Sequence, residues 1–255
     1  MDTIATDSIW FDKLTWPEID ALNRERTILV LITGCTEQAG PHLPIDGDNF
    51  FFTLFISEPA RHARDEGIPV YLLPPIPYGP AEEHMAFPGT ISLSFETHHR
   101  LVKEVLHSLA RHGFRKMLVM EGCGGHHCLP AALEVRSELR QRGFDAKIWV
   151  IGQGTTCYRI AQKVFGWEPK GVHADDFATS VFLARRPEAV RMDKLGAGNE
   201  FDPTAFPEAW FMDEIDPRGF TADVRRATAE IGERLLEKVW DYWLGQLRRI
   251  NQTTV

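Results

Sequence analysis

Acidic, histidine and cysteine side chains gather in four segments of this sequence, where their types and spacing could bind a metal or move protons. The segment GCTEQAGPHLPIDGDN contains Glu37 and Asp48, and the segment EGCGGHHC contains Cys123 followed by the adjacent His126 and His127. Carboxylate, imidazole and thiolate groups are the usual ligands of zinc and other divalent metals. These residue types therefore favour a metal or acid–base centre assembled from several segments.

The other two segments place histidine beside acidic residues. One contains Glu83 and His84, and the other contains His173 and Asp176. Each residue also has a structural interpretation: Asp176 could stabilise a helix start, and an isolated Cys123 is more often a small buried hydrophobe. No single residue is decisive, and the stronger argument for a site is that all four segments are expected at the same edge of the fold.

A scaffold must bring these segments together, and the sequence predicts alternating strands and helices. Short apolar runs predict strands over residues 27–33, 69–73, 116–120 and 146–151. Apolar periodicity predicts helices over residues 48–64, 95–112, 129–142, 174–185 and 221–247, with Pro59 an unfavourable residue in the first. This alternation predicts a single α/β domain over residues 1–255, with three α/β/α layers and a mainly parallel central sheet. Ligands bind outside the carboxyl ends of such strands, which is where the four segments are expected.

Composition narrows the class of partner. The chain has 255 residues with 44% hydrophobic and 25% charged residues, which excludes a disordered or fibrous protein. Its net charge of −8, with no basic stretch, disfavours nucleic-acid binding. No apolar run approaches the ~20 residues of a membrane span, residues 1–10 do not read as a signal peptide, and four cysteines without a CxxC pair suggest a reducing compartment. We therefore expect a cytoplasmic protein with a small-molecule ligand and no membrane or nucleic-acid partner.

The motifs around these residues resemble those of the creatininase (creatinine amidohydrolase) family over about residues 15–236. Residues 37–44 (EQAGPHLP) with Asp48 are similar to the family's EQHGPHLP…D, and residues 78–93 resemble its YG…EH..FPGT.SL segment. Residues 121–126 align with NGHGGN, and residues 173–180 align with HAGE.ETS. The four motifs occur in the same order, so the match is specific.

The resemblance implies an α/β/α domain that assembles into a homo-oligomer. It also implies a metal-dependent hydrolase, often with two metals, that acts on cyclic amides, formamides or related C–N bonds. In such chemistry a divalent metal lowers the pKa of bound water and polarises the carbonyl group. The family's metal-binding glutamate and aspartate correspond here to Glu37 and Asp48.

Three departures from the motifs bear on the metal. Ala39 replaces the histidine of the first motif, Cys123 replaces the NGH histidine, and Ala178 replaces the glutamate of the last motif. Alanine cannot ligate a metal, so the two-metal site cannot form in its usual way, whereas a cysteine thiolate can bind zinc. These departures predict one metal at Glu37, Asp48 and Cys123, with zinc favoured over manganese or iron, or else complete loss of the metal.

Two classes of function remain open. In the first, a diverged hydrolase uses metal-activated water against a small polar cyclic amide, formamide or related ring. His173 would then act as general acid and base, Asp176 would orient His173 or the water, and the substrate would contact Glu83, His84 and His126.

In the second class, the scaffold works without metal. It would be either an enzyme that uses Cys123 or the histidines for isomerisation, ring opening or condensation, or a non-catalytic assembly subunit. Four aromatic residues are expected either to line a pocket or to pack in a subunit interface: Phe201, Phe206, Trp210 and Phe211.

Overall fold

The centre of the fold is a parallel four-stranded sheet. The structure is a computed structural model that describes residues 8–123, 125–201 and 209–255. The strand order is β2-β1-β3-β4, and every neighbouring pair is parallel. The strand bounds are β1 Ile28–Thr33, β2 Val70–Leu72, β3 Lys116–Glu121 and β4 Lys147–Gly152. All four predicted strands are confirmed to within one residue at either end.

The helices of the described chain surround this sheet. The α-helices are α1 Trp16–Asp20, α2 Gly47–Asp65, α3 Phe95–Arg111, α4 Leu129–Gln141, α5 Gln153–Val164, α6 Asp176–Arg185, α7 Met212–Ile215 and α8 Ala229–Gln252. Short 3-10 turns are η1 Phe11–Lys13, η2 Glu82–His84, η3 Pro187–Ala189, η4 Met192–Lys194 and η5 Val224–Arg226. None of the described helices is long and apolar enough to cross a membrane.

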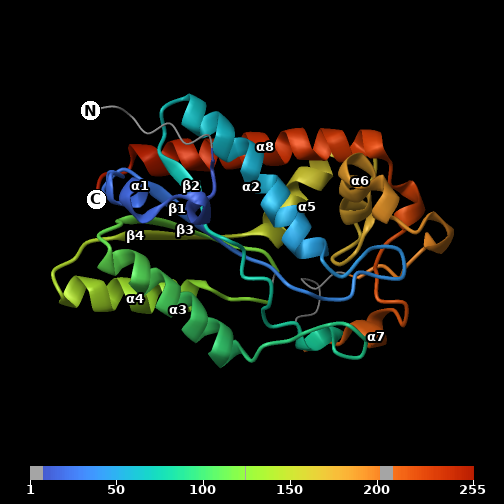
Figure 1. Cartoon of the computed structure of the whole chain (residues 1–255). Coiled ribbons are helices and arrows are strands. Elements are labelled where there is room, and N and C mark those ends of the chain that lie inside the picture. Colours follow the sequence, from blue (N-terminus) through green and yellow to red (C-terminus); the bar gives the residue numbers. More distant parts are fainter. Residues whose placement is uncertain (1–7, 124, 202–208) are drawn as a thin grey trace.

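Alternating side chains of β1 divide the interior into two cores. Ile28, Val30 and Ile32 face a core formed with α2, α5, α6 and α8. Leu29 and Leu31 face the opposite core, formed with α3 and α4. The sheet thus lies between two helical layers (Figure 1), as the predicted α/β/α arrangement requires.

Three details differ from the predicted elements. Helix α2 continues through Pro59, which is buried. Helix α8 begins at Ala229 rather than residue 221, because the Thr228 side chain accepts a hydrogen bond from the Ile231 backbone and caps the helix there. Helices α1, α5 and α7 were not predicted.

The strand order places a topological switch point between β1 and β3. The chain leaves β1 toward α2 on one face of the sheet, whereas it leaves the adjacent β3 toward α4 on the other face. The two connections diverge at this switch point, where open α/β sheets bind ligands. The predicted site segments follow these same two strands.

Candidate active site and metal centre

Four potential metal ligands meet at the carboxyl ends of β1 and β3. Donor atoms of Cys35, Glu37, Asp48 and Cys123 all lie within 4.8 Å of one another, and we call this set the four-donor group. Cys35 and Glu37 follow β1, Asp48 lies in the first turn of α2, and Cys123 follows β3. The structure thus brings the three predicted ligands together and adds Cys35, which sequence reasoning missed.

A glycine permits the close approach of the β3 loop. The Gly122 backbone donates a 2.9 Å hydrogen bond to the Thr33 carbonyl oxygen. A Cβ at Gly122 would lie 2.2 Å from that oxygen and 2.3 Å from the Phe52 ring. Only glycine therefore fits beside β1 and lets the next residue, Cys123, reach the four-donor group.

The four-donor group is acidic and poorly solvated. Burial, followed by the charges of Cys123 and Asp48, raises the pKa of Glu37 well above its usual value, and burial raises the pKa of Asp48 to about 7. Glu37 is 4% exposed, and its Oε2 is buried with no hydrogen-bond partner among the described residues. An unpartnered buried carboxylate is costly, and a divalent cation would satisfy it. These residues therefore fit a metal.

A second cluster shares Glu37 and contains two predicted site histidines. The rings of His84 and His173 lie 4.0 Å apart, and Nδ1 of His173 is 3.7 Å from Oε1 of Glu37. Nε2 of His173 lies 2.8 Å from the Gln38 carbonyl oxygen, so this nitrogen carries the proton and Nδ1 is left as an acceptor. Burial lowers the pKa of His173 to about 4 and that of His84 to about 2, so both rings are neutral near pH 7.

Asp176 lies at the start of α6, beside Trp167. Its Oδ2 accepts a 2.8 Å hydrogen bond from the Trp167 indole, and no hydrogen bond to His173 occurs among the described residues. His173 is oriented instead by the Gln38 carbonyl and by Thr221, whose hydroxyl accepts from the His173 backbone N–H at 3.1 Å. The first turn of α6 directs Asp176 toward Trp167, and its neighbour Asp175 caps that helix.

The predicted substrate-binding residues separate into different environments. His126 is buried, and its ring contacts Cys35 and Thr33. It therefore lies in the interior beside the Cys35 sulfur and is not exposed to a substrate. The adjacent His127 is exposed, with a φ of 48° that turns it outward. Glu83 is half-buried, and its pKa is raised by burial.

Aromatic residues border the second cluster. Trp210 meets His84 edge-on with ring centroids 6.4 Å apart, and Phe201 meets Trp210 at 5.3 Å. Phe211 is 47% exposed, and Phe206 lies outside the described residues. Ala39 and Ala178 occupy two positions where the family motifs carry metal ligands, and both are buried core residues.

A set of carboxylates, thiols and histidines at the carboxyl edge of a parallel sheet defines a candidate metal-dependent hydrolase. The chain matches the creatinine amidohydrolase (creatininase) family over residues 12–247, and it belongs to that family of hydrolases. The mycofactocin precursor peptide peptidase of Mycobacterium ulcerans (strain Agy99) is 31% identical over 252 residues, which cover 92% of this chain and 86% of that protein. The creatinine amidohydrolase of Pseudomonas putida is 28% identical over 252 residues, which cover 90% of this chain and 92% of that protein.

Solved structures agree with this assignment. A manganese creatininase has a TM-score of 0.80 and 25% identity, with 96% of this chain and all of that chain covered. A crystal structure of creatinine amidohydrolase has a TM-score of 0.82 at 24% identity and covers 98% of this chain and all of that chain. The second comparison supports the fold alone.

Proposed function

We propose that this chain is a metal-dependent hydrolase that cleaves a C–N bond in a small polar cyclic amide, formamide or related ring. The observation that carries the proposal is the buried, unpartnered Oε2 of Glu37 inside a group of four acidic donors. The names of two relatives, an amidohydrolase and a peptidase, also describe C–N bond hydrolysis.

Glu37, Asp48 and Cys123 would hold one divalent cation, with zinc favoured because a thiolate is among the ligands. When bound, the cation supplies Lewis acidity and lowers the pKa of a water molecule. Ala39 and Ala178 stand where the motifs carry further donors, so one ion is proposed rather than two.

His173 is the proposed proton acceptor. Its Nε2–H donates to the Gln38 carbonyl, which leaves the Nδ1 lone pair facing Glu37 and the four-donor group. The ring is neutral near pH 7 because burial lowers its pKa to about 4. It can therefore take a proton from the attacking water and return it to the leaving nitrogen.

Glu83, His84 and Trp210 would contact the substrate. Gln38 Nε2 lies 3.0 Å from His84 Nδ1, which fixes the ring, and Trp210 approaches that ring edge-on. Glu83 adds a half-buried carboxyl group. Polar groups beside an aromatic wall suit a small, planar amide.

A second candidate is a metal-free cysteine enzyme, and one observation favours it. Nε2 of His126 lies 3.0 Å from Cys35 Sγ, and Nδ1 of the same ring lies 3.0 Å from the Thr33 hydroxyl, which resembles an oriented cysteine–histidine pair. Cys35, however, is wholly buried, and a contact with Cys123 followed by burial raises its pKa. A nucleophilic thiol needs the opposite: a lowered pKa and access. Rapid alkylation of a single thiol in metal-free protein, with loss of activity, would favour this candidate.

The test of the hydrolase proposal compares Asp48→Asn with Asp46→Asn. Asp46 is a nearby carboxylate whose Oδ2 pairs with Arg186 at 2.8 Å outside the four-donor group, so it controls for charge. Zinc content is measured by elemental analysis, and hydrolysis is measured on a panel of cyclic amides and formamides. We expect Asp48→Asn to lose both zinc and activity and Asp46→Asn to retain both. A wild-type protein that stays metal-free after zinc addition would refute the proposal.

A further inference from the structure

Cys35 is a potential ligand that the family motifs do not include. It lies two residues before Glu37, directly after β1, and its side chain is wholly buried. It belongs to both cysteine-containing groups of possible ligands, one with Cys123 and His126 and the other with Glu37, Asp48 and Cys123. The two thiols therefore lie at the centre of the donor set.

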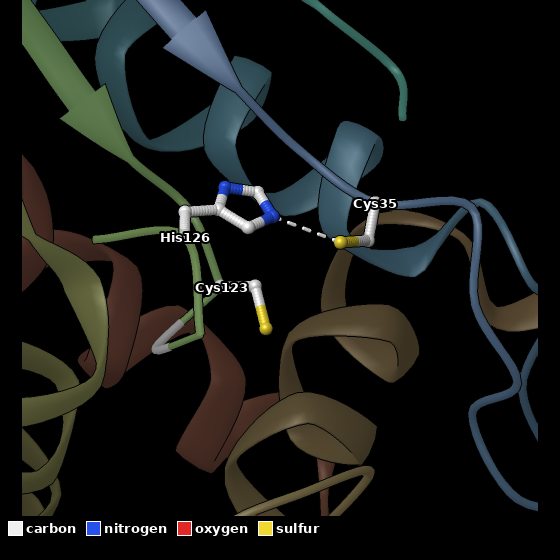
Figure 2. Close-up of side chains that lie close together, drawn as sticks. All are labelled: Cys35, Cys123 and His126. Carbon is white, nitrogen blue, oxygen red and sulfur yellow. Dashed lines mark hydrogen bonds between the residues drawn. The ribbon is translucent and has the colours of Figure 1, made fainter. Parts of the chain in front are cut away.

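An imidazole nitrogen lies against the sulfur of Cys35. The Thr33 hydroxyl donates to the Met120 carbonyl oxygen at 3.4 Å and lies 3.0 Å from His126 Nδ1. Nε2 of the same ring lies 3.0 Å from Cys35 Sγ, and in the tautomer that carries its proton on Nε2 it would donate to a Cys35 thiolate. Figure 2 shows the imidazole directed at Cys35, with Cys123 beside them. Such a donor aimed at a ligand atom orients the ligand and tunes its affinity for metal.

Neighbouring residues fix the position of the His126 ring. A Cβ at Gly79 would lie 2.2 Å from His126 Nε2, so the ring packs directly on the glycine backbone. His98 covers another side of the ring, with centroids 4.7 Å apart. His126 is thus held by the Thr33 hydroxyl, the Gly79 backbone and the His98 ring, and its Nε2 faces the Cys35 sulfur.

We propose that Cys35 is a metal ligand and that Cys35 and Cys123 bind the cation as a pair of thiolates, with Glu37 and Asp48 as the oxygen ligands. This inference rests on the metal site of the proposed function and specifies its chemistry. Two thiolates select a thiophilic cation such as zinc, or its substitutes cobalt and cadmium, over manganese and magnesium, which prefer oxygen ligands. His126 acts as a positioning residue through its hydrogen bond to Cys35.

The first test counts sulfur ligands in the unaltered protein. X-ray absorption of the zinc-loaded full chain should show two sulfur scatterers at about 2.3 Å, the usual zinc–sulfur distance. One sulfur scatterer would overturn the Cys35 assignment and leave the metal site of the proposed function intact. No zinc binding at all would refute both.

The second test uses cobalt as a spectroscopic probe under reducing conditions. Cobalt-loaded wild-type protein should show a near-ultraviolet thiolate-to-cobalt charge-transfer band. We expect Cys35→Ala and Cys123→Ala each to retain about half of its intensity per bound cobalt, in proportion to the thiolates left as ligands. Cys128→Ala is the matched control, because it removes a buried thiol outside the four-donor group. Full intensity in Cys35→Ala would overturn the proposal.

The third test isolates the positioning role of His126. His126→Phe keeps an aromatic ring but removes the Nε2 that faces Cys35. We expect zinc affinity to fall by about 10- to 100-fold, the usual effect of removing a hydrogen-bond partner of a ligand. His127→Phe, the exposed neighbour, should bind zinc as the wild type does. Equal affinity in both variants would contradict the positioning role.

Discussion

At the scale of single residues, burial acts in opposite directions on the two kinds of titratable group in the site. It raises the pKa of Asp48 to about 7 and lowers the pKa of His173 to about 4, because in both cases it disfavours the charged form. Without a cation, Glu37 and Asp48 therefore tend to hold protons while His84 and His173 do not. The proposed proton acceptor is consequently available at neutral pH.

This division predicts separate effects on binding and on chemistry. His173→Gln should retain zinc but lower kcat for amide hydrolysis by about 10²- to 10⁴-fold, the usual contribution of general acid–base catalysis. Glutamine can still donate to the Gln38 carbonyl, but it cannot accept a proton at neutral pH. Steady-state kinetics and zinc content measured on the same preparation check this. An unchanged kcat would exclude His173 from the chemistry.

His42 makes a pH-dependent contribution to stability. Its ring is buried, packs against Phe220 and lies 2.9 Å from the Thr179 hydroxyl, and burial lowers its pKa to about 4 from 6.5. Between pH 6.5 and 4 the unfolded chain takes up a proton that the folded chain does not, so stability falls as the pH falls. Relative to His42→Gln, the wild type should lose on the order of 3 kcal/mol of unfolding free energy from pH 7 to pH 4. Urea unfolding at several pH values checks this, and a constant difference would contradict it.

The sequence predicted Glu37, Asp48 and Cys123 as neighbours because their motifs match a family, but it did not single out Cys35. A cysteine after a buried strand is usually a small core residue, and nothing in its own type marks it as a ligand. The available signal was its position two residues before Glu37, beyond the same strand. The role predicted for Asp176 stays a prediction, and the sequence did not indicate its contact with the Trp167 indole at the start of α6.

At the scale of elements, the site depends on how closely the β3 loop approaches β1. The strands pair in parallel over their full length, from Ile28 with Lys116 to Thr33 with Glu121. The next residue of the β3 chain, Gly122, extends this pairing, because its backbone N–H donates a hydrogen bond to the Thr33 carbonyl oxygen. The position of Cys123 is therefore set by the sheet itself.

Gly122→Ala should separate the two loops. The added methyl group would overlap the Thr33 carbonyl oxygen and the Phe52 ring, and such overpacking costs about 1–3 kcal/mol. We expect this loss in unfolding free energy together with weaker zinc binding, because Cys123 moves with the loop. Gly245→Ala in α8 is the control, since a Cβ there meets open space. Wild-type zinc affinity in Gly122→Ala would contradict the proposed role of the loop.

Most elements could be predicted from the sequence, the strands from their short apolar runs and helices α3 and α8 from a marked apolar periodicity. Residues 221–227 were wrongly included in the last helix: their backbone instead forms bridges, Ala197 with Asp223 and Asn199 with Thr221. Those bridges join segments more than twenty residues apart in the chain. The apolar pattern within one segment carries no information about such pairing. Thr228, a favourable cap residue, was the local signal for the true start.

At the scale of the whole molecule, the proposed ligands come from segments that lie on both sides of the switch point. Asp48 belongs to α2, which packs in the core with α8, whereas Cys123 and His126 lie in the loop that leads to α4 and the opposite core. A cation bound between them would link the two helical layers. Unfolding must separate these ligands, so binding and folding are coupled.

Zinc should therefore stabilise the entire fold. A ligand that binds only the folded state adds about 2.7 kcal/mol when its free concentration is 100 times Kd, and Tm rises by about 2–4 °C per kcal/mol for a chain of this size. We expect zinc to raise the Tm of chelator-treated wild-type protein accordingly, and manganese at equal concentration to raise it less. Asp48→Asn should show no zinc-dependent gain, whereas Asp46→Asn should respond as the wild type does. Identical melting curves with zinc and with chelator would show that no cation joins the two layers, and both the hydrolase proposal and the thiolate pair would then fail.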